Sequence, residues 1–390
     1  MKRRHVLGTL AAAAALSQAP LAQAQETIVI GFGGGLTGYL AYYDGLVLNG
    51  AQMAVDEINA AGGIAGKYMI DFQVKDVRSE AAAAAVAGNE LVAAGAVALI
   101  SPCDADPAIA FAQPAQAAQI PVIAPCASTP VLFAAVGDYT FQTYTADNLQ
   151  AAVSAKYARE RGYANAYILI SPDTPYTEKL PLYFADAFQK MGGALVGQGT
   201  YAFGQQDFSA EVTNIKALDP QPDVIMTSAY EPDFPAFIKQ LRAAGITTPV
   251  IGSDGIDSGT TLALGEIAEG VVFTTGGFPA PGSDLEAFYK AYVARYGGAI
   301  ETDVAPFAAV AHEAVMTLAK AIEAAGSTEG AAIRDALAAM TDFKGVTGST
   351  VALNTPNNVA LRDVALVRVT GGAKEHLGNM QPAAADVPAP

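Results

Sequence analysis

Short apolar runs alternate with longer amphipathic or alanine-rich segments along most of the chain. Thr27–Phe32 is a continuous β-rich run, as expected of a strand that is buried on both faces of a sheet. A glycine-rich loop follows, and the apolar spacing from about Gly45 to Ala61 predicts a helix that ends at Gly62-Gly63. Further strands are predicted near 69–76, 97–101, 121–125, 139–143, 166–171, 194–200, 223–228, 249–253 and 270–274.

This alternation favours an α/β fold, with parallel strands covered by helices on both faces. The helices are predicted in the gaps between the strands, most clearly in the alanine-rich stretches 80–94, 107–118 and 147–162. With 390 residues the chain is long enough for two such lobes, each with its own core. Ligands of doubly wound sheets bind beyond the carboxyl ends of the strands, so functional residues are expected in the loops that follow them.

The first 24 residues have the pattern of an export signal. Lys2 to Arg4 precede an apolar run from Val6 to Leu16, and Ala22 to Ala24 form a small-x-small cleavage site. The run is about half as long as a membrane span. We therefore expect cleavage after Ala24 and a periplasmic protein, with a membrane anchor as the alternative. The Arg3-Arg4 pair leaves open whether export uses the general secretory or the twin-arginine route.

Composition and charge exclude several classes of function. Lys and Arg number 22 against 38 Asp and Glu, which gives a formal charge of −16 and an acidic surface that repels phosphate backbones. We therefore expect no nucleic-acid partner. The three histidines, His5, His312 and His376, leave little for a metal site or a Ser-His-Asp triad, and we expect no metal and no cofactor. An exported hydrolase remains the enzymatic alternative, but the sequence has no Gly-x-Ser-x-Gly or His-Glu-x-x-His motif.

The glycine-rich loop after the first strand matches a dinucleotide-binding pattern. Gly33 to Gly38 read G-x-G-x-x-G, but no acidic residue ends a second strand about 20 residues later. A flexible loop that lets the backbone approach a small ligand is the simpler interpretation.

The two cysteines form a candidate disulfide. Cys103 and Cys126 each follow a short β-like run, at 97–101 and 121–125. If these runs are neighbouring parallel strands, both cysteines reach the same edge of one sheet. In an oxidising compartment a bond between them would stabilise the fold by about 3 kcal/mol in the chain-entropy model. Two free thiols near a binding site are the alternative.

Several further motifs occur in a fixed order along the chain. They are Leu36 to Gly38, Asn49 to Asn59, Gly62 to Gly66, Ile120 to Pro130, Gln206 to Ser209 and Gln240 to Gly245. This order resembles that of the periplasmic Leu/Ile/Val-binding proteins, the type I substrate-binding proteins of ABC importers. The resemblance extends over nearly the whole chain after the export signal, to about residue 370.

The resemblance implies two doubly wound parallel-sheet lobes, joined by a three-strand hinge, that close on a ligand. The first lobe would combine 26–143 with 276–345, and the second 144–275 with 346–372. The crossovers would lie near 143–145, 274–277 and 345–348. The remainder, 373–390, is rich in Ala and Pro and is expected to be a flexible tail.

In the first lobe, the resemblance places ligand-binding residues in three loops. Tyr43 would form an aromatic wall in the loop before the first helix, and Asp104 follows a strand. The backbone of Cys126 and the hydroxyl and amide of Ser128 would bind polar groups of the ligand. The helix that begins just after Asp104 would favour a negative ligand group at its N-terminus. Packing for Tyr43 and helix capping for Ser128 are the structural alternatives.

In the second lobe, the resemblance selects three more residues. Tyr176 and Tyr230 match tyrosines that close over the ligand, a task that suits a broad apolar ring with a polar tip. Asp254 matches an acid that pairs with the ammonium group of the ligand. An Asx turn before Gly255 is the structural alternative for Asp254.

Asp104 departs from the amino-acid binders, which usually have Ser at this place. An ionised Asp104 would face the ligand carboxylate, and two such charges about 4 Å apart repel by about 4 kcal/mol at an effective dielectric constant of 20. Asp104, Asp106 and Asp254 together suit an amine, an amide or another donor-rich ligand. Capping of the helix expected at Pro107 is the alternative role for Asp104.

These features predict a solute-binding protein and not an enzyme. It would capture a small polar ligand, an amino acid or a related amine or amide, and deliver it to the membrane permease of an ABC importer. A ligand-binding subunit of a periplasmic sensing or chemotaxis system is the alternative, because its site would look the same. In either case a monomer is expected.

Overall fold

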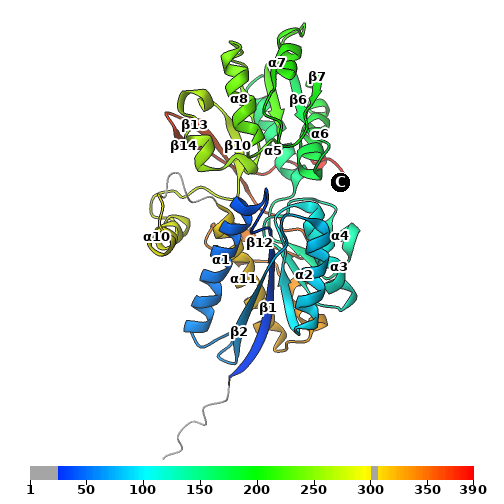
Figure 1. Ribbon diagram of the computed structural model, residues 1–390, viewed down its shortest axis with the longest axis vertical. Coiled ribbons are helices and arrows are strands. Elements are labelled where there is room, and N and C mark those ends of the chain that lie inside the picture. Colours follow the sequence, from blue (N-terminus) through cyan, green and yellow to red (C-terminus); the bar gives the residue numbers. More distant parts are fainter. Residues whose placement is uncertain (1–24, 300–305) are drawn as a thin grey trace, which may run out of the picture.

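The computed structural model describes residues 25–299 and 306–390. The described chain forms two lobes, each built on one large sheet with helices on both faces (Figure 1). This is the α/β architecture that the strand–helix alternation predicts. The expected export signal at 1–24 lies outside the described residues. In the part of the chain that is described, no helix combines the length and the apolar character needed to cross a membrane.

The first lobe contains a five-stranded parallel sheet in the order β2-β1-β3-β4-β5. Its strands are β1 (Glu26–Gly34), β2 (Tyr68–Asp76), β3 (Ala96–Ile100), β4 (Val122–Ala124) and β5 (Thr140–Gln142). Its helices are α1 (Ala41–Ala60), α2 (Ala81–Ala93), α3 (Ala105–Ala117), α4 (Leu132–Val136), α10 (Asp284–Tyr296), α11 (Pro306–Ala325) and α12 (Gly330–Ala338). Figure 1 shows α1 and α11 on one side of the sheet and α2 and α3 on the other.

Close packing of α1 on α11 depends on a glycine. A Cβ atom at Gly50 would lie 1.9 Å from the carbonyl oxygen of Ala308, so only glycine lets the two helices approach this far. The apolar face that α1 buries includes Val47, Ala51 and Ala54, none of which is exposed to solvent. The first strand is therefore covered by a helix that starts at the cleft end of the lobe.

The second lobe contains a seven-stranded sheet in the order β14-β13-β10-β9-β8-β6-β7. Its parallel strands are β6 (Asn165–Ile170), β7 (Ala194–Thr200), β8 (Val224–Thr227), β9 (Val250–Ile251) and β10 (Val272–Thr275). An antiparallel pair, β13 (Val364–Thr370) and β14 (Ala373–Met380), completes one edge. Its helices are α5 (Asp147–Glu160), α6 (Pro175–Lys190), α7 (Ser209–Lys216), α8 (Asp233–Ala243) and α9 (Gly259–Leu262), with the 3-10 turns η1 (Asp254–Ile256), η2 (Gly265–Ala268) and η3 (Ala384–Asp386).

The third crossover lies later in the chain than the sequence predicts. β11 (Phe343–Lys344) and β12 (Thr350–Val351) form a hairpin, and the backbone N–H of Gln142 donates to the carbonyl oxygen of Asn358. Val351, Leu353 and Ala360 are buried in the same core as β1 and α1. Residues 346–361 thus pack on the first lobe, and the prediction of a crossover near 345–348 is wrong, because these apolar side chains hold the segment there. The chain enters the second lobe only at β13.

The prediction of a flexible tail at 373–390 is also wrong. β14 pairs along its length with β13, and the ring of His376 stacks on Phe278 with 4.8 Å between centroids. Lys374 Nζ lies 2.7 Å from the buried carboxylate of Asp257. Beyond the strand, Asn148 Nδ2 donates to the carbonyl oxygen of Pro388 at 2.9 Å. Ladder hydrogen bonds and a buried ion pair order a segment whose composition is typical of disorder.

Arg362 ties the crossovers to one another. Its Nη1 donates to the carbonyl oxygen of Thr143 in the first crossover at 2.9 Å, and its Nη2 to Thr347 Oγ1 at 2.6 Å. The same guanidinium lies 2.9 Å from a carboxylate oxygen of Glu313 on α11, and neither side chain is more than 2% exposed. A buried ion pair therefore sits at the hinge between the lobes.

Candidate functional site

A hollow of about 460 Å³, including the space open to solvent, lies where the two lobes meet. The first lobe contributes Leu40, Tyr43, Cys103, Asp104, Ala105, Cys126, Ser128, Thr129 and Phe307, and the second contributes Asp147, Tyr176, Tyr230, Asp254 and Gly255. All seven residues that the sequence selected as ligand-binding candidates line this one hollow. They come from loops and helix starts at the carboxyl ends of strands, as the fold predicts.

Tyr43 reaches across the cleft from α1. It lies in the first turn of that helix, which begins at Ala41, and not in the preceding loop as predicted. Its ring packs edge-on against Tyr230 of the second lobe and Phe307 of the first, at centroid distances of 5.7 and 5.4 Å. Its hydroxyl donates to the carbonyl oxygen of Gly255 at 2.9 Å. Tyr43 therefore joins the lobes directly, and burial raises its pKa well above the usual value.

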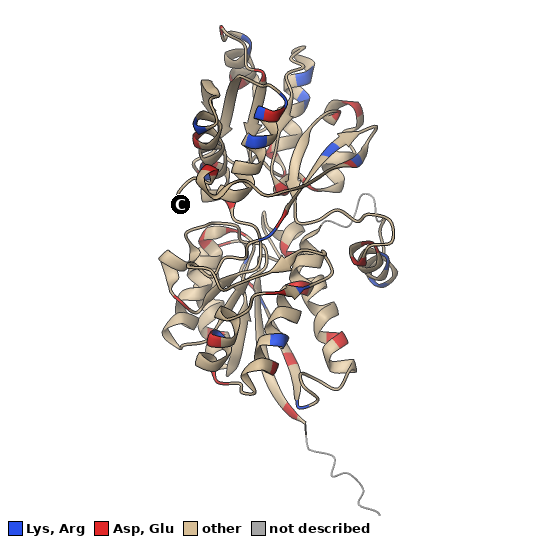
Figure 2. Cartoon of the chain, turned by 180° about the vertical axis from the view of Figure 1, so that it is seen from behind, with Lys and Arg blue, Asp and Glu red and all other residues tan. Residues whose placement is uncertain are grey.

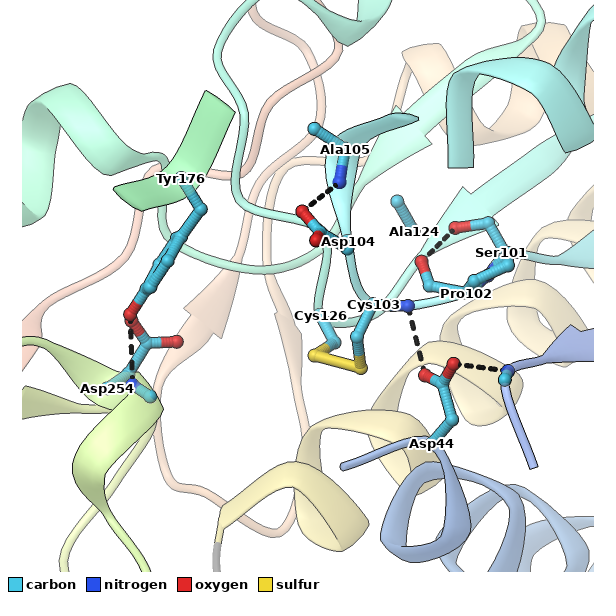
Figure 3. Close-up of a disulfide and its surroundings, with 12 residues drawn as sticks. Asp44, Ser101, Pro102, Cys103, Asp104, Ala105, Ala124, Cys126, Tyr176 and Asp254 are labelled. Carbon is cyan, nitrogen blue, oxygen red and sulfur yellow. Dashed lines mark hydrogen bonds between the residues drawn. A yellow bond between two sulfur atoms is a disulfide. The ribbon is translucent and has the colours of Figure 1, made fainter. Parts of the chain in front are cut away.

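The expected disulfide is present between Cys103 and Cys126 (Figure 3). β3 and β4 are parallel neighbours, with Leu99 opposite Val122, so both cysteines leave the same edge of the sheet. Their Cα atoms are 4.6 Å apart, within the range of natural disulfides. The bond fixes the two loops that carry Asp104 and Ser128.

Asp104 caps α3 and also faces the hollow. The helix begins at Ala105, two residues earlier than predicted, and the backbone N–H of Ala105 donates to Asp104 Oδ1 at 2.7 Å. The hydroxyl of Tyr39 donates to Asp104 Oδ2 at 2.9 Å. Desolvation by burial raises the pKa of Asp104, while these two hydrogen bonds oppose the rise. The capping role and the cleft position are therefore combined in one carboxylate.

Asp254 and Tyr176 form the opposite side of the hollow (Figure 3). The hydroxyl of Tyr176 donates to Asp254 Oδ1 at 2.9 Å and accepts from the backbone N–H of Gly255 at the same distance. The Tyr176 hydroxyl is also 2.6 Å from Ser253 Oγ. Burial raises the pKa of Asp254 to about 6, and hydrogen bonds from Tyr176 and Tyr144 lower it. The tyrosine is thus held in place by the segment that carries the acid.

Sequence reasoning missed Asp147, the third carboxylate of the hollow. Asp147 is the first residue of α5, only 2% exposed, and its Oδ1 has no hydrogen-bond partner. Burial raises its pKa well above the usual value, Ser128 lowers it by a hydrogen bond, and the charges of Asp254 and Asp104 raise it further. Asp147 could have been identified from its position just after the first crossover, at the start of a predicted helix. Thr129 and Phe307 were missed as well.

Acidic residues outnumber basic ones in the lining of the hollow. Among the described residues that line it, three are acidic and none is Lys, Arg or His. Asp44, behind the disulfide, accepts from the backbone N–H groups of Gly35 at 2.6 Å and Cys103 at 3.0 Å, and burial raises its pKa to about 7. Figure 2 shows that Lys and Arg lie mainly on the outer helices, loops and strands of the two lobes.

The chain is similar to known proteins over most of its length. A family model described as periplasmic binding protein matches residues 27–374. The Leu/Ile/Val-binding protein BraC3 of Rhizobium johnstonii is 30% identical over 319 residues, which cover 82% of this chain and 84% of that protein.

Solved structures agree with this assignment. The branched-chain amino acid transporter substrate-binding protein LivJ of Streptococcus pneumoniae, solved in complex with isoleucine, superposes with a TM-score of 0.81 at 29% identity. The match covers 92% of this chain and 100% of LivJ. The leucine-binding protein LivK of Thermotoga maritima shares the fold with a TM-score of 0.82 at 24% identity, covering 91% and 99% of the two chains. The chain therefore belongs to the periplasmic binding protein family, among the type I proteins that are similar to Leu/Ile/Val-binding proteins.

Proposed function

We propose that this protein is an extracytoplasmic solute receptor that captures a small polar ligand by closing its two lobes. The observation that carries the proposal is that side chains of both lobes surround one hollow and contact one another across it. The Tyr43 hydroxyl bonds to Gly255, and the ring of Tyr39 packs edge-on against Phe203 at 5.3 Å. A ligand that fills this hollow touches both lobes and thereby stabilises the closed arrangement.

The lining of the hollow supports an amino acid or a related amine or amide as the ligand. Tyr43, Tyr176 and Tyr230 offer apolar walls with polar tips, and Asp254 and Ser128 offer acceptors and a hydroxyl. The relatives are solute-binding proteins by name, and LivJ was solved with isoleucine. The same relatives support a non-enzymatic role.

Delivery to the permease of an ABC importer completes the proposal. It is supported by LivJ, which is described as the substrate-binding protein of a branched-chain amino acid transporter. The sequence supports export with cleavage after Ala24, so the mature chain would meet the permease in the periplasm. We propose that it does so as a monomer.

A thermal-shift screen of amino acids, amines, amides and organic acids tests the solute-binding role. Because a ligand that binds only the folded state adds to its stability, a bound compound raises the melting temperature with its concentration. Small-angle scattering of the same samples is expected to show a more compact protein with the ligand. A screen in which no compound raises the melting temperature would contradict the proposal. Loss of uptake of the ligand when the gene is deleted tests the transport role.

A further inference from the structure

Two residues that line the hollow each have a buried polar atom without a partner in the protein. Asp147 Oδ1 and the hydroxyl of Tyr230 are both without a hydrogen bond, and their residues are only 2% and 4% exposed. A buried carboxylate oxygen without a donor is costly, and where its residue lines a ligand cleft a donor on the ligand can satisfy it. Asp147 itself has a hydrogen bond with Ser128, but its Oδ1 has no donor. The other two acids of the hollow accept from at least two protein groups each: Asp104 from Ala105 and Tyr39, and Asp254 from Tyr176 and Tyr144.

The acidic residues at the helix starts make the hollow unfavourable for a carboxylate on the ligand. A helix N-terminus is the natural seat for an anion. The N-terminus of α3 is occupied by its own capping residue, Asp104, and the first turn of α5 carries Asp147. The sequence predicted that the start of α3 would favour a negative ligand group, but a ligand anion would there meet the Asp104 carboxylate instead. The described residues that line the hollow include no cation to offset this repulsion.

Four aromatic residues also line the hollow. Tyr43 packs edge-on against Tyr230 and Phe307, and Tyr176 packs edge-on against Tyr230 with 5.7 Å between centroids. The negative faces of such rings attract cations, and their area packs against an apolar body. Three carboxylates and four aromatic rings around one small hollow therefore favour an organic cation.

We propose that the cleft selects a small organic cation that carries N–H donors and no carboxylate, with Asp147 binding its charged nitrogen. Primary amines, amidines and amino-acid amides belong to this class, whereas free α-amino acids do not. This inference rests on the proposed solute-binding function and narrows it. It also separates this chain from LivJ, which was solved with isoleucine.

Probes of similar size and different charge test the inference. Isothermal titration calorimetry compares leucine, its amide leucinamide, the amine 3-methylbutylamine and the acid 4-methylpentanoate, which share one branched apolar body. Propylamine, acetamidine, putrescine and agmatine extend the cations to other sizes. At least one cation is expected to bind about tenfold or more tightly than leucine, and 4-methylpentanoate is expected not to bind.

Substitution of Asp147 tests the named contact. Asp147→Asn keeps the shape of the side chain and removes its charge, so affinity for the best cation is expected to fall about tenfold or more while leucine binds no worse. Asp233→Asn is the matched control. Asp233 lies in the first turn of α8, is fully buried and also has an unpartnered Oδ1, but it does not line the hollow. The control variant is expected to bind the cation like the parent protein.

Three other outcomes would each contradict a different part of the proposal. If leucine or 4-methylpentanoate binds more tightly than every cation, the inference is wrong and the solute-binding function stands. If a cation binds and Asp147→Asn changes its affinity no more than Asp233→Asn does, the role of Asp147 is wrong. If no probe of any charge class binds at millimolar concentration, and the wider thermal-shift screen is also negative, the proposed function fails together with the inference.

Discussion

The hydroxyl of Tyr43 in the first lobe donates a hydrogen bond of 2.9 Å to the carbonyl oxygen of Gly255 in the second. Both groups are buried and line the hollow, and we expect this bond to form only when the cleft is closed. Because Gly255 follows Asp254, this bond connects Tyr43 to the part of the second lobe that would hold the ligand.

Tyr43→Phe is expected to weaken ligand binding by destabilising the closed state. The ring stays in place against Tyr230 and Phe307, and only the hydrogen bond between the lobes is lost. Such a bond contributes about 1 kcal/mol, so the dissociation constant should rise about fivefold in calorimetry. Tyr296→Phe is the control, since its hydroxyl donates to the carbonyl oxygen of Asn49 within the first lobe. Equal affinities for both variants would contradict the closing role of Tyr43.

Asp104→Ser is expected to shift the preference among ligands. Serine is also a good N-cap, so α3 keeps its start while the cleft loses one negative charge. A ligand carboxylate about 4 Å away would be relieved of up to about 4 kcal/mol of repulsion at an effective dielectric constant of 20. Calorimetry should therefore detect better binding of leucine and weaker binding of cationic ligands. Unchanged affinities for both classes would leave Asp104 as a helix cap only.

Removal of the disulfide is expected to lower stability. Cys103 and Cys126 are 23 residues apart, and closing a loop of this size is worth about 3 kcal/mol in the chain-entropy model. A variant with both cysteines replaced by Ser should show this loss in urea denaturation. Alkylation under denaturing, non-reducing conditions should detect no free thiol in the parent protein from the periplasm. Two alkylated cysteines would disprove the bond.

The ligand-free protein is expected to lose stability as the pH rises from about 4 to 7. Burial raises the pKa of Asp254 and Asp233 to about 6 and that of Asp44 to about 7, from a usual value of 3.8. Between these values the folded state binds more protons than the unfolded state, so the free energy of unfolding falls with rising pH. Melting temperatures measured across this range should fall accordingly.

Asp254→Asn should flatten that pH dependence, because it removes one of the titrating carboxyls. Asp207→Asn is the control, since hydrogen bonds from Ser209 lower the pKa of this exposed group and its titration falls below the window. A melting temperature that rises from pH 4 to 7 in the parent protein would contradict the assignment of raised pKa values to the buried acids.

Strand–helix alternation and motif order together predict most of the fold. The alternation depends on local sequence, and the order of the motifs resembles that of a known family. The run Thr27–Phe32 reads as a buried strand and lies within β1, and the positions of Cys103 and Cys126 after two neighbouring strands predict their bond. The site candidates come from the family resemblance, and Ser128 of the first lobe and Asp254 of the second line one hollow.

What the sequence does not predict depends on contacts between distant segments. Asp147 reads as an ordinary first-turn acid, and nothing in its local sequence indicates that its Oδ1 is buried without a donor. Residues 346–361 pack on the first lobe because the side chains of Leu353 and Ala360 are buried in its core. The tail forms β14 because β13 offers it an edge, which outweighs the composition of the segment.

Breaking the hinge ion pair is expected to be among the most costly single changes. Glu313 is fully buried and Arg362 only 2% exposed, so Arg362→Met leaves a buried carboxylate with two donors from Thr347 and no cation. Loss of one partner of such a pair costs about 3–5 kcal/mol, which urea denaturation would detect. Arg295→Met is the control, because its pair with Asp56 is exposed and worth about 0–1 kcal/mol. The double variant Glu313→Gln, Arg362→Met should recover part of the loss, since no unpaired charge remains in the core. A cost for Arg362→Met no larger than that for Arg295→Met would mean that water reaches the hinge and that the pair does not fix the crossovers.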